Sequence, residues 1–141
     1  MNRYLGLDVG DSTVGVAVSD LLGLTAQGVE TIRRKSLAED ISRLGTLMEE
    51  YETDKLVVGL PKNMNGTQGE RCAAVRDFVL AVAEAYPNAE AIFWDERLST
   101  VAAERSLLEA DLSRRKRKRV IDKMAAVFIL QGYLDSIRFK G

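Results

Sequence analysis

The chain has 141 residues, of which 46% are hydrophobic, and this length and composition suit one domain over residues 1–141 with one sizeable core. The sequence contains no histidine and a single cysteine, Cys72, which excludes most zinc sites, Ser-His-Asp triads, Cys-His pairs and an internal disulfide. The net charge is −1 at pH 7, but the charges are unevenly distributed: residues 114–119 form a strongly basic run, and the rest of the chain is acidic. Any catalysis should therefore depend on carboxylates, Lys, Arg, hydroxyls or a metal held by oxygen ligands.

The sequence has no features that indicate a membrane protein. No apolar run approaches the roughly 18 residues of a membrane-spanning helix. The N-terminus is typical of a strand with an internal acid rather than of a signal peptide. We therefore expect a cytoplasmic protein.

Three strands should open the chain as an antiparallel meander. Residues 3–9 and 14–19 form two short apolar strands joined by a tight turn, and residues 24–33 can supply the third. Asp8 lies near the end of the first strand. Gly10 follows it and keeps the backbone low enough for a phosphate or a metal to approach. Asp8 is therefore the first candidate site residue.

The rest of the chain alternates helices and strands. Two capping boxes, Ser36–Glu39 and Thr67–Glu70, mark the starts of two helices. Between these helices, residues 55–60 form a continuous apolar run, which is typical of a strand buried on both faces. The predicted elements after the meander are, in order, a helix to Tyr51, a strand at 55–60, a helix to Tyr86, a strand at 91–94 and helices at 99–109 and 119–137.

This order predicts an α/β fold with a mixed five-stranded sheet, in which a three-stranded antiparallel meander and two parallel strands are flanked by helices. Right-handed crossovers would place the two later strands beyond the first strand and parallel to it. Their carboxyl ends would then share a rim with Asp8, where functional groups collect in open α/β sheets. Residues 61–66 and the pair Asp95–Glu96 thus become candidate neighbours of Asp8.

The last helix supplies a further acid. Asp122 shares one helical stripe with Ala125, Ala126, Ile129 and Tyr133, so it should project from the side that packs inward. A carboxylate facing a sheet is costly unless it is paired, protonated or bound to a metal. The alternative is that Asp122 interacts only with the helix dipole.

Asp8, an acid of the Asp95–Glu96 pair and Asp122 would form a cluster that cannot stay fully ionised without a cation. Oxygen-only ligands suit Mg2+ or Mn2+. Two such ions can activate water and stabilise the leaving oxygen in phosphodiester hydrolysis. Together with the basic run, the cluster indicates a nuclease.

The period of two in the strand at 91–94 bears on which acid is the ligand. If Ile92 and Trp94 share one face, Glu96 continues that face and Asp95 belongs to the other. We favour Glu96 as the ligand and a supporting role for Asp95. Arg97 could hold a substrate phosphate or pair with a neighbouring carboxylate. Trp94 itself suits the core better than a base-stacking role.

Several segments, in one order over nearly the whole chain, strongly resemble the YqgF/RuvX family. They are Leu7–Gly10 with Val14–Asp20, Val58–Pro61 with Asn63–Gly66, the highly specific block Asp95–Thr100, and Val120–Ala126 with Ile129–Leu134. That family is similar to Holliday junction resolvases of the RuvC type and has the ribonuclease H-like fold. The resemblance implies a metal-dependent nuclease that matures the 5′ end of 16S ribosomal RNA from its precursor, with junction resolution as an older proposal.

The resemblance also assigns residues. The family's acids fall on Asp8, Glu96 and Asp122, with Mg2+ or Mn2+ as the implied cofactor. Asp11 departs from the small polar or hydroxyl residue of many such chains, and it either adds a fourth acid or caps the hairpin turn, which we favour.

Several basic and amide side chains are candidates for binding nucleic acid, with precursor ribosomal RNA favoured over branched DNA as the partner. The basic run suits a polyanion because each neutralised phosphate releases counterions, although a solvated helix end or a loop would also explain it. Nothing in the residues favours a homodimer over a monomer. The candidates are Lys62, Asn63, Asn65, Arg97, Arg114, Arg115, Lys116, Arg117, Lys118 and Arg119.

Two other classes of function remain open. Asp8–Gly10 followed by Gly15 also resembles the first phosphate loop of actin-like and sugar-kinase ATPases, although a chain this short lacks the second domain that closes over a nucleotide. A non-catalytic RNA-binding or transcription-associated module would keep the fold and use only the basic run. Tight ATP binding, or ATP turnover that is lost in Asp8→Asn, would favour the ATPase. The binding module instead predicts that replacing Asp8, Glu96 or Asp122 with Asn or Gln leaves function in cells intact.

Overall fold

The computed structural model describes residues 3–63, 65–98 and 114–140, and in the last helix it describes side chains only from Met124 to Arg138. The predicted helix at 99–109 lies outside the described residues. Among the described helices, none is both long and apolar enough to cross a membrane.

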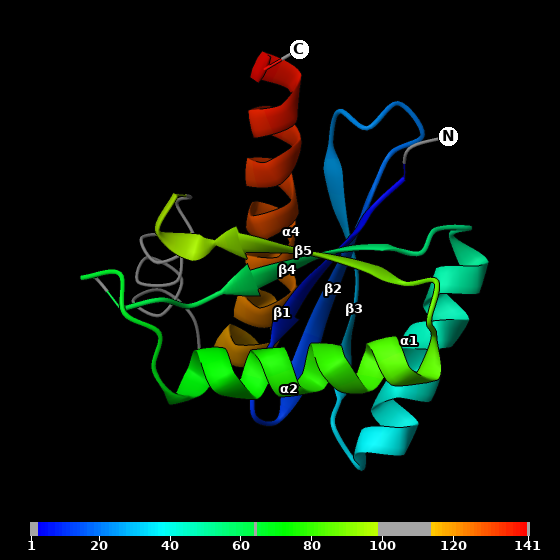
Figure 1. Cartoon of the computed structure of the whole chain (residues 1–141), viewed down its shortest axis with the longest axis vertical. Coiled ribbons are helices and arrows are strands. Elements are labelled where there is room, and N and C mark those ends of the chain that lie inside the picture. Colours follow the sequence, from blue (N-terminus) through cyan, green and yellow to red (C-terminus); the bar gives the residue numbers. More distant parts are fainter. Residues whose placement is uncertain (1–2, 64, 99–113, 141) are drawn as a thin grey trace.

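A five-stranded sheet forms the centre of the fold, with the strand order β3-β2-β1-β4-β5 (Figure 1). β1 pairs antiparallel with β2 and parallel with β4, so the two later strands extend the sheet beyond β1, as predicted. β2 and β3 are antiparallel, and β4 and β5 are parallel. The strands are β1 (Leu5–Val9), β2 (Thr13–Ser19), β3 (Ala26–Arg33), β4 (Lys55–Leu60) and β5 (Glu90–Asp95).

Helices cover both faces of the sheet. Helices α1 and α2 lie on one face, and α4 crosses the other (Figure 1). A short 3-10 turn, η1, follows β5 directly. The bounds are α1 (Leu37–Glu50), α2 (Glu70–Ala85), η1 (Glu96–Leu98) and α4 (Arg114–Lys140).

The structure confirms one of the two predicted capping boxes and contradicts the other. Ser36 caps α1, because its side chain accepts a hydrogen bond from the Glu39 backbone N–H. The second capping box is wrong: Gly69 is the N-cap of α2 and supplies no side-chain bond. The Thr67 hydroxyl instead forms hydrogen bonds within the preceding loop, because Thr side chains can bond locally in place of capping a helix.

Helix α4 begins at Arg114, five residues before the predicted start at residue 119, so it includes the basic run.

Alternation along β1 divides its side chains between the two faces. Leu5, Leu7 and Val9 belong to the core under α1 and α2. Gly6 and Asp8 occupy the intervening positions and therefore face α4. The hydrophobic strand thus presents one carboxylate to the α4 side of the sheet.

Glycines and alanines bring α4 close to the sheet. Ala125 and Ala126 are buried, as their position on the predicted inward stripe requires. An added Cβ on Gly6 would lie 2.7 Å from Leu130 Cβ and 2.9 Å from the Ala126 carbonyl oxygen. The helix backbone therefore fits against β1 only because residue 6 has no side chain.

Candidate active site

Asp8 is a buried carboxylate between two glycine positions. Its side chain is only 6% exposed. On one side, Asp8 pairs with Gly15 of β2. On the other side, Leu7 pairs with Val58 of β4, so the next residue of β4, Gly59, lies beside Asp8. The carboxylate therefore has no Cβ beside it on either neighbouring strand.

Glu96 lies on the same face of the sheet as Asp8. Ile92 and Trp94 of β5 pack into the core beneath α4, and Glu96 opens η1 immediately after the strand. A Cβ added to Gly59 would be 3.0 Å from Glu96 Oε2, which places this carboxylate over β4. Asp8 and Glu96 thus flank Gly59 on the α4 side, as the period of two predicted for Glu96.

The course of the α4 backbone bears on where residue 122 lies relative to this pair. The Tyr4 and Tyr133 rings meet with centroids 5.4 Å apart, whereas Ala126 lies at Gly6, so α4 runs antiparallel to β1. Residue 122 is one turn before Ala126, so the helix backbone there lies further along in the direction in which β1 runs to Asp8. The side chain of residue 122 lies outside the described residues.

Asp95 pairs with Arg97 instead of facing the candidate site. Arg97 Nη2 lies 2.7 Å from Asp95 Oδ2, and Arg97 Nε donates to the same carboxylate. These side-chain hydrogen bonds, with the Arg97 backbone N–H and the charges of Arg97 and Lys62, hold the pKa of Asp95 below its usual value despite partial burial. Arg97 Nη1 would also be 3.4 Å from a Cβ on Gly66. Asp95 therefore orients a guanidinium beside the loop that follows β4.

The amide side chains of that loop stabilise its own turn. Asn63 Nδ2 donates to Thr67 Oγ1 over 2.9 Å, and Asn65 Oδ1 accepts from the Thr67 hydroxyl over 2.7 Å. Gly66 has a φ of +87°, which favours glycine. The turn-forming interpretation accounts for Asn63 and Asn65, which are both exposed. Lys62 is half-buried and close enough for its charge to affect Asp95.

Two other candidates have mainly structural settings. Trp94 packs on Gly132 and edge-on to Tyr133, with ring centroids 6.3 Å apart, which agrees with the core interpretation. Asp11 is exposed in the hairpin turn between β1 and β2. The basic run occupies the first turns of α4, and its side chains lie outside the described residues.

Sequence reasoning missed a buried ion pair next to this hairpin. Asp40 is 2% exposed, and its Oδ2 lies 3.1 Å from Arg34 Nε. Arg34 also donates from Nη1 to the Gly10 carbonyl oxygen over 2.8 Å. An acid in the first turn of a helix is common, so the sequence contains no signal that Asp40 is buried.

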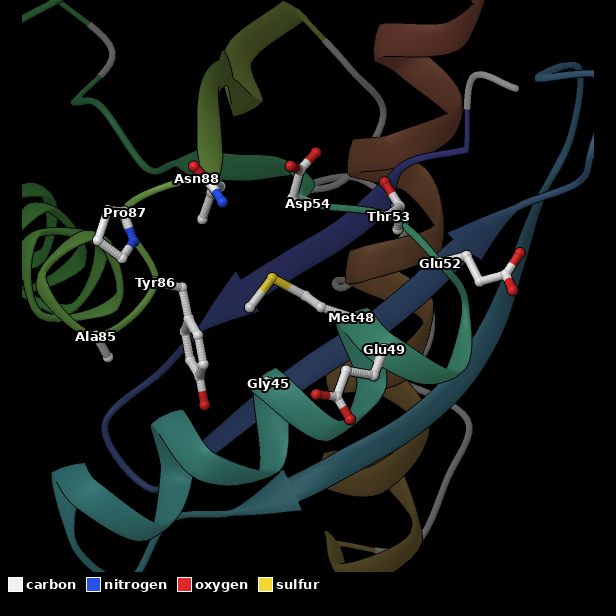
Figure 2. A pocket seen from close by; sticks show the side chains of 11 residues that line it. Gly45, Met48, Glu49, Glu52, Thr53, Asp54, Ala85, Tyr86, Pro87 and Asn88 are labelled. Carbon is white, nitrogen blue, oxygen red and sulfur yellow. The ribbon is translucent and has the colours of Figure 1, made fainter.

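The described side chains contain no group of three or more His, Cys, Asp or Glu residues arranged to hold a metal. Asp8 and Glu96 supply two carboxylates, and Asp122 is not among the side chains searched. A cavity of about 490 Å3 lies elsewhere, at the amino ends of β4 and β5 (Figure 2). Met48, Glu49 and Tyr86 are among its lining residues, and none of the predicted site residues is.

Two solved structures share the fold of this chain. The structure of Thermus thermophilus RuvC in complex with a Holliday junction substrate is similar with a TM-score of 0.65 and 13% identity, covering 98% of this chain and 96% of that one. A second Thermus thermophilus RuvC structure gives a TM-score of 0.56 at 13% identity, covering 98% and 97% of the two chains. The predicted ribonuclease H-like α/β fold is therefore confirmed.

Sequence comparisons identify the family. Chains named as candidate pre-16S rRNA nucleases are 62% identical in Clostridioides difficile, covering 94% of both chains, and 59% identical in Staphylococcus haemolyticus, covering 97% of this chain and 98% of that one. A Clostridium botulinum chain with the same name is 57% identical and covers 96% of this chain and 98% of its own length. The family model described as RuvX, Holliday junction resolvase, matches residues 2–136. The chain therefore belongs to the RuvX family.

Proposed function

We propose that this chain is a metal-dependent nuclease that hydrolyses phosphodiester bonds with Asp8, Glu96 and Asp122. The observation that carries the proposal is the placement of Asp8 and Glu96, from distant segments, on either side of Gly59 on one face of the sheet. Two carboxylates beside bare backbone leave a phosphate group room to approach. The position of residue 122 on α4 supports a third carboxylate there.

The donor set fits Mg2+ or Mn2+. The chain has no histidine, and the three acids offer only oxygen atoms. Asp8 is 6% exposed, and an ionised carboxylate so buried needs a cation or hydrogen-bond donors beside it. Such ions, when bound, supply an acidified water and neutralise charge on the phosphate. The three carboxylates would hold them and thereby fix the position of the scissile phosphate.

Basic side chains at the carboxyl ends of β4 and β5 would bind the substrate backbone. Arg97 is held by Asp95 beside Gly66, and Lys62 lies near the same carboxylate. The basic run at the start of α4 adds six charges on the helix that carries Asp122. Phosphate contacts of this kind position a nucleic acid and carry no sequence information themselves.

The proposed substrate is precursor 16S ribosomal RNA, cleaved in the cytoplasm to give the mature 5′ end. The names of relatives 57–62% identical support this substrate. Branched DNA is the second candidate, favoured by the description of the family model and by the RuvC-like fold. A purely RNA-binding module would leave the grouping of Asp8 and Glu96 without a function.

The test is a parallel cleavage assay on precursor RNA, a four-way DNA junction and an unstructured single strand, each with Mg2+ and Mn2+. Asp8→Asn and Glu96→Gln should abolish cleavage while nucleic-acid affinity largely survives, because phosphate contacts dominate that affinity. Asp77→Asn, an exposed acid of α2, is the matched control and should cleave normally.

The outcomes separate the candidates. Preferential cleavage of the DNA junction would replace the RNA substrate but keep the site. Undiminished cleavage by an Asp8→Asn, Glu96→Gln double variant would overturn the site itself. Mg2+ titration by calorimetry gives an independent measure, since each acid substitution should weaken ion binding even without substrate.

A further inference from the structure

Arg34 makes two hydrogen bonds to the hairpin turn that follows Asp8. Within the turn, the Gly10 backbone N–H donates to the Thr13 carbonyl oxygen over 2.8 Å. Arg34, directly after β3, reaches the turn twice. Its backbone N–H donates to the Ser12 carbonyl oxygen over 2.9 Å, and its Nη1 donates to the Gly10 carbonyl oxygen over 2.8 Å. The turn is thus hydrogen-bonded to the end of β3 at both Gly10 and Ser12.

A buried carboxylate holds this arginine in place. Asp40 Oδ2 lies 3.1 Å from Arg34 Nε, and Asp40 Oδ1 accepts from the Lys35 backbone N–H over 3.1 Å. Asp40 is 2% exposed in the first turn of α1, where the helix dipole favours a negative charge. The Arg34 guanidinium also lies over the Phe78 ring of α2, 5.1 Å from its centroid. Arg34 therefore connects α1 and α2 to the turn.

We propose that Arg34 and Asp40 are positioning residues for Asp8, acting through the Gly10 carbonyl and the hairpin turn. The inference rests on the proposed nuclease function. Asp8 lies one residue before the end of β1, and Gly10 is the first residue after that strand. Carboxylates that bind ions or reacting groups must be held to within about 0.5 Å by their supporting shell. The pair supplies that support from the face of the sheet opposite to α4.

The geometry requires an arginine. Arg34 uses Nε for Asp40, Nη1 for Gly10 and its flat face for Phe78. A lysine has one nitrogen and no flat face, so it keeps the charge but cannot make these contacts together. Arg34→Lys is therefore the informative substitution.

Arg43→Lys is the matched control. Arg43 also pairs with a carboxylate between α1 and β3, donating from Nε to Glu30 Oε2 over 2.9 Å, and the structure gives it no bond to the hairpin turn. The two variants make the same chemical change, and only one of them should affect Asp8.

The experiment uses the full chain and measures kcat and KM on the substrate that the wild type cleaves, Mg2+ affinity by calorimetry, hydrogen exchange of the Gly10 amide, and Tm. Arg34→Lys should lower kcat and Mg2+ affinity by roughly 10- to 100-fold, the usual effect of losing an outer-shell partner. KM should change less than about twofold, since phosphate contacts are intact, and Gly10 exchange should accelerate. Asp40→Asn should act in the same direction, and Arg43→Lys should change Tm alone among these five quantities.

Wild-type kcat and Mg2+ affinity in Arg34→Lys would overturn the positioning role, as would an effect on KM alone. Equal losses in Arg34→Lys and Arg43→Lys that follow Tm would show a purely structural role and overturn it too. A wild-type chain that neither binds Mg2+ nor cleaves would overturn the proposed function together with this inference. An active wild type whose activity Arg34→Lys retains would overturn the inference alone.

Discussion

The carboxylate of Glu96 lies directly over Gly59: a Cβ on Gly59 would stand 3.0 Å from Glu96 Oε2 and 2.4 Å from Ile129 Cδ1. Gly59 is also adjacent to Asp8 across the parallel pair of β1 and β4. Because Gly59 has no side chain, Ile129 of α4 can pack against β4, and the carboxylates of Asp8 and Glu96 can share the surface above the glycine. The glycine links the packing of the core to the geometry of the site.

Gly59→Ala should weaken both packing and ion binding. The added methyl must displace the end of Ile129, and overpacking of this kind costs about 1–3 kcal/mol of unfolding free energy. It must also shift Glu96, so Mg2+ affinity and kcat should fall by roughly tenfold or more. Denaturant unfolding and calorimetric Mg2+ titration measure the two effects separately.

Gly45→Ala is the control for stability alone. Gly45 packs against the Tyr86 ring and hydroxyl on the opposite face of the sheet, among the residues that line the cavity in Figure 2. Its substitution should destabilise the fold without changing Mg2+ affinity. If both variants lost Mg2+ affinity in proportion to their stability, the contact of Gly59 with Glu96 would have no special role.

The fold, and the side of the sheet on which Glu96 lies, could be predicted from the sequence. Both depend on the regular spacing of side chains along strands and helices. Alternation along residues 91–96 placed Glu96 with Ile92 and Trp94, and the helical stripe ending at Tyr133 placed the buried face of α4. The contact from Arg34 to Gly10 has no such period, because it joins residues 24 positions apart through a side chain. The prediction that Thr67 caps α2 failed for a related reason. A capping box is recognised from local spacing alone, whereas the Thr67 hydroxyl bonds to Asn63 and Asn65 in its own loop.

Arg97 should contact a phosphate while remaining bound to Asp95. Arg97→Gln should reduce the slope of log affinity against log salt concentration by about one, because one phosphate contact is lost. Asp95→Asn keeps the guanidinium charge, so the slope should stay near the wild-type value. Filter binding of single-stranded RNA across a salt series measures both. An unchanged slope in Arg97→Gln would show that this arginine only pairs with Asp95.

Acid titration should separate the ion pair of Glu30 and Arg43 from the rest of the fold. The hydrogen bonds from Arg43 lower the pKa of Glu30 in the folded chain, with the charge of Arg43 adding to the effect against partial burial. A lowered folded-state pKa gives stability that is present above the unfolded-state pKa, about 4.3, and is lost as the pH falls through the folded-state value. Arg43→Gln should therefore lower Tm at pH 7 more than at pH 2.

The measurement is a pair of Tm profiles from pH 2 to pH 7 for the wild type and Arg43→Gln. Both groups are partly exposed, so the difference at pH 7 should correspond to no more than about 1 kcal/mol. Arg138→Gln, which breaks an exposed pair with Asp135 within α4, is a control of the same charge change. Profiles that stay parallel down to pH 2 would contradict the assignment of this acid-sensitive stability to Glu30.

The basic run at the start of α4 should bind nucleic acid at a cost to the free helix. Six basic residues in the first turns oppose the helix dipole, which favours acids there, and phosphate groups would neutralise them. Substituting Arg114, Lys116 and Lys118 by Gln should reduce the salt slope of RNA binding by about two to three. It should also raise Tm slightly, because the repulsion at the helix start is relieved.

A triple variant with the same loss of charge elsewhere, Arg43→Gln, Arg71→Gln and Arg138→Gln, separates a local contact from net charge. Counterion release depends on which phosphates are neutralised, so this variant should keep most of the wild-type slope. A general field effect would instead lower affinity equally in both triple variants. Equal slopes in the two variants would therefore remove the basic run from the binding surface, and Lys62 and Arg97 near the carboxyl ends of β4 and β5 would remain as the proposed phosphate contacts.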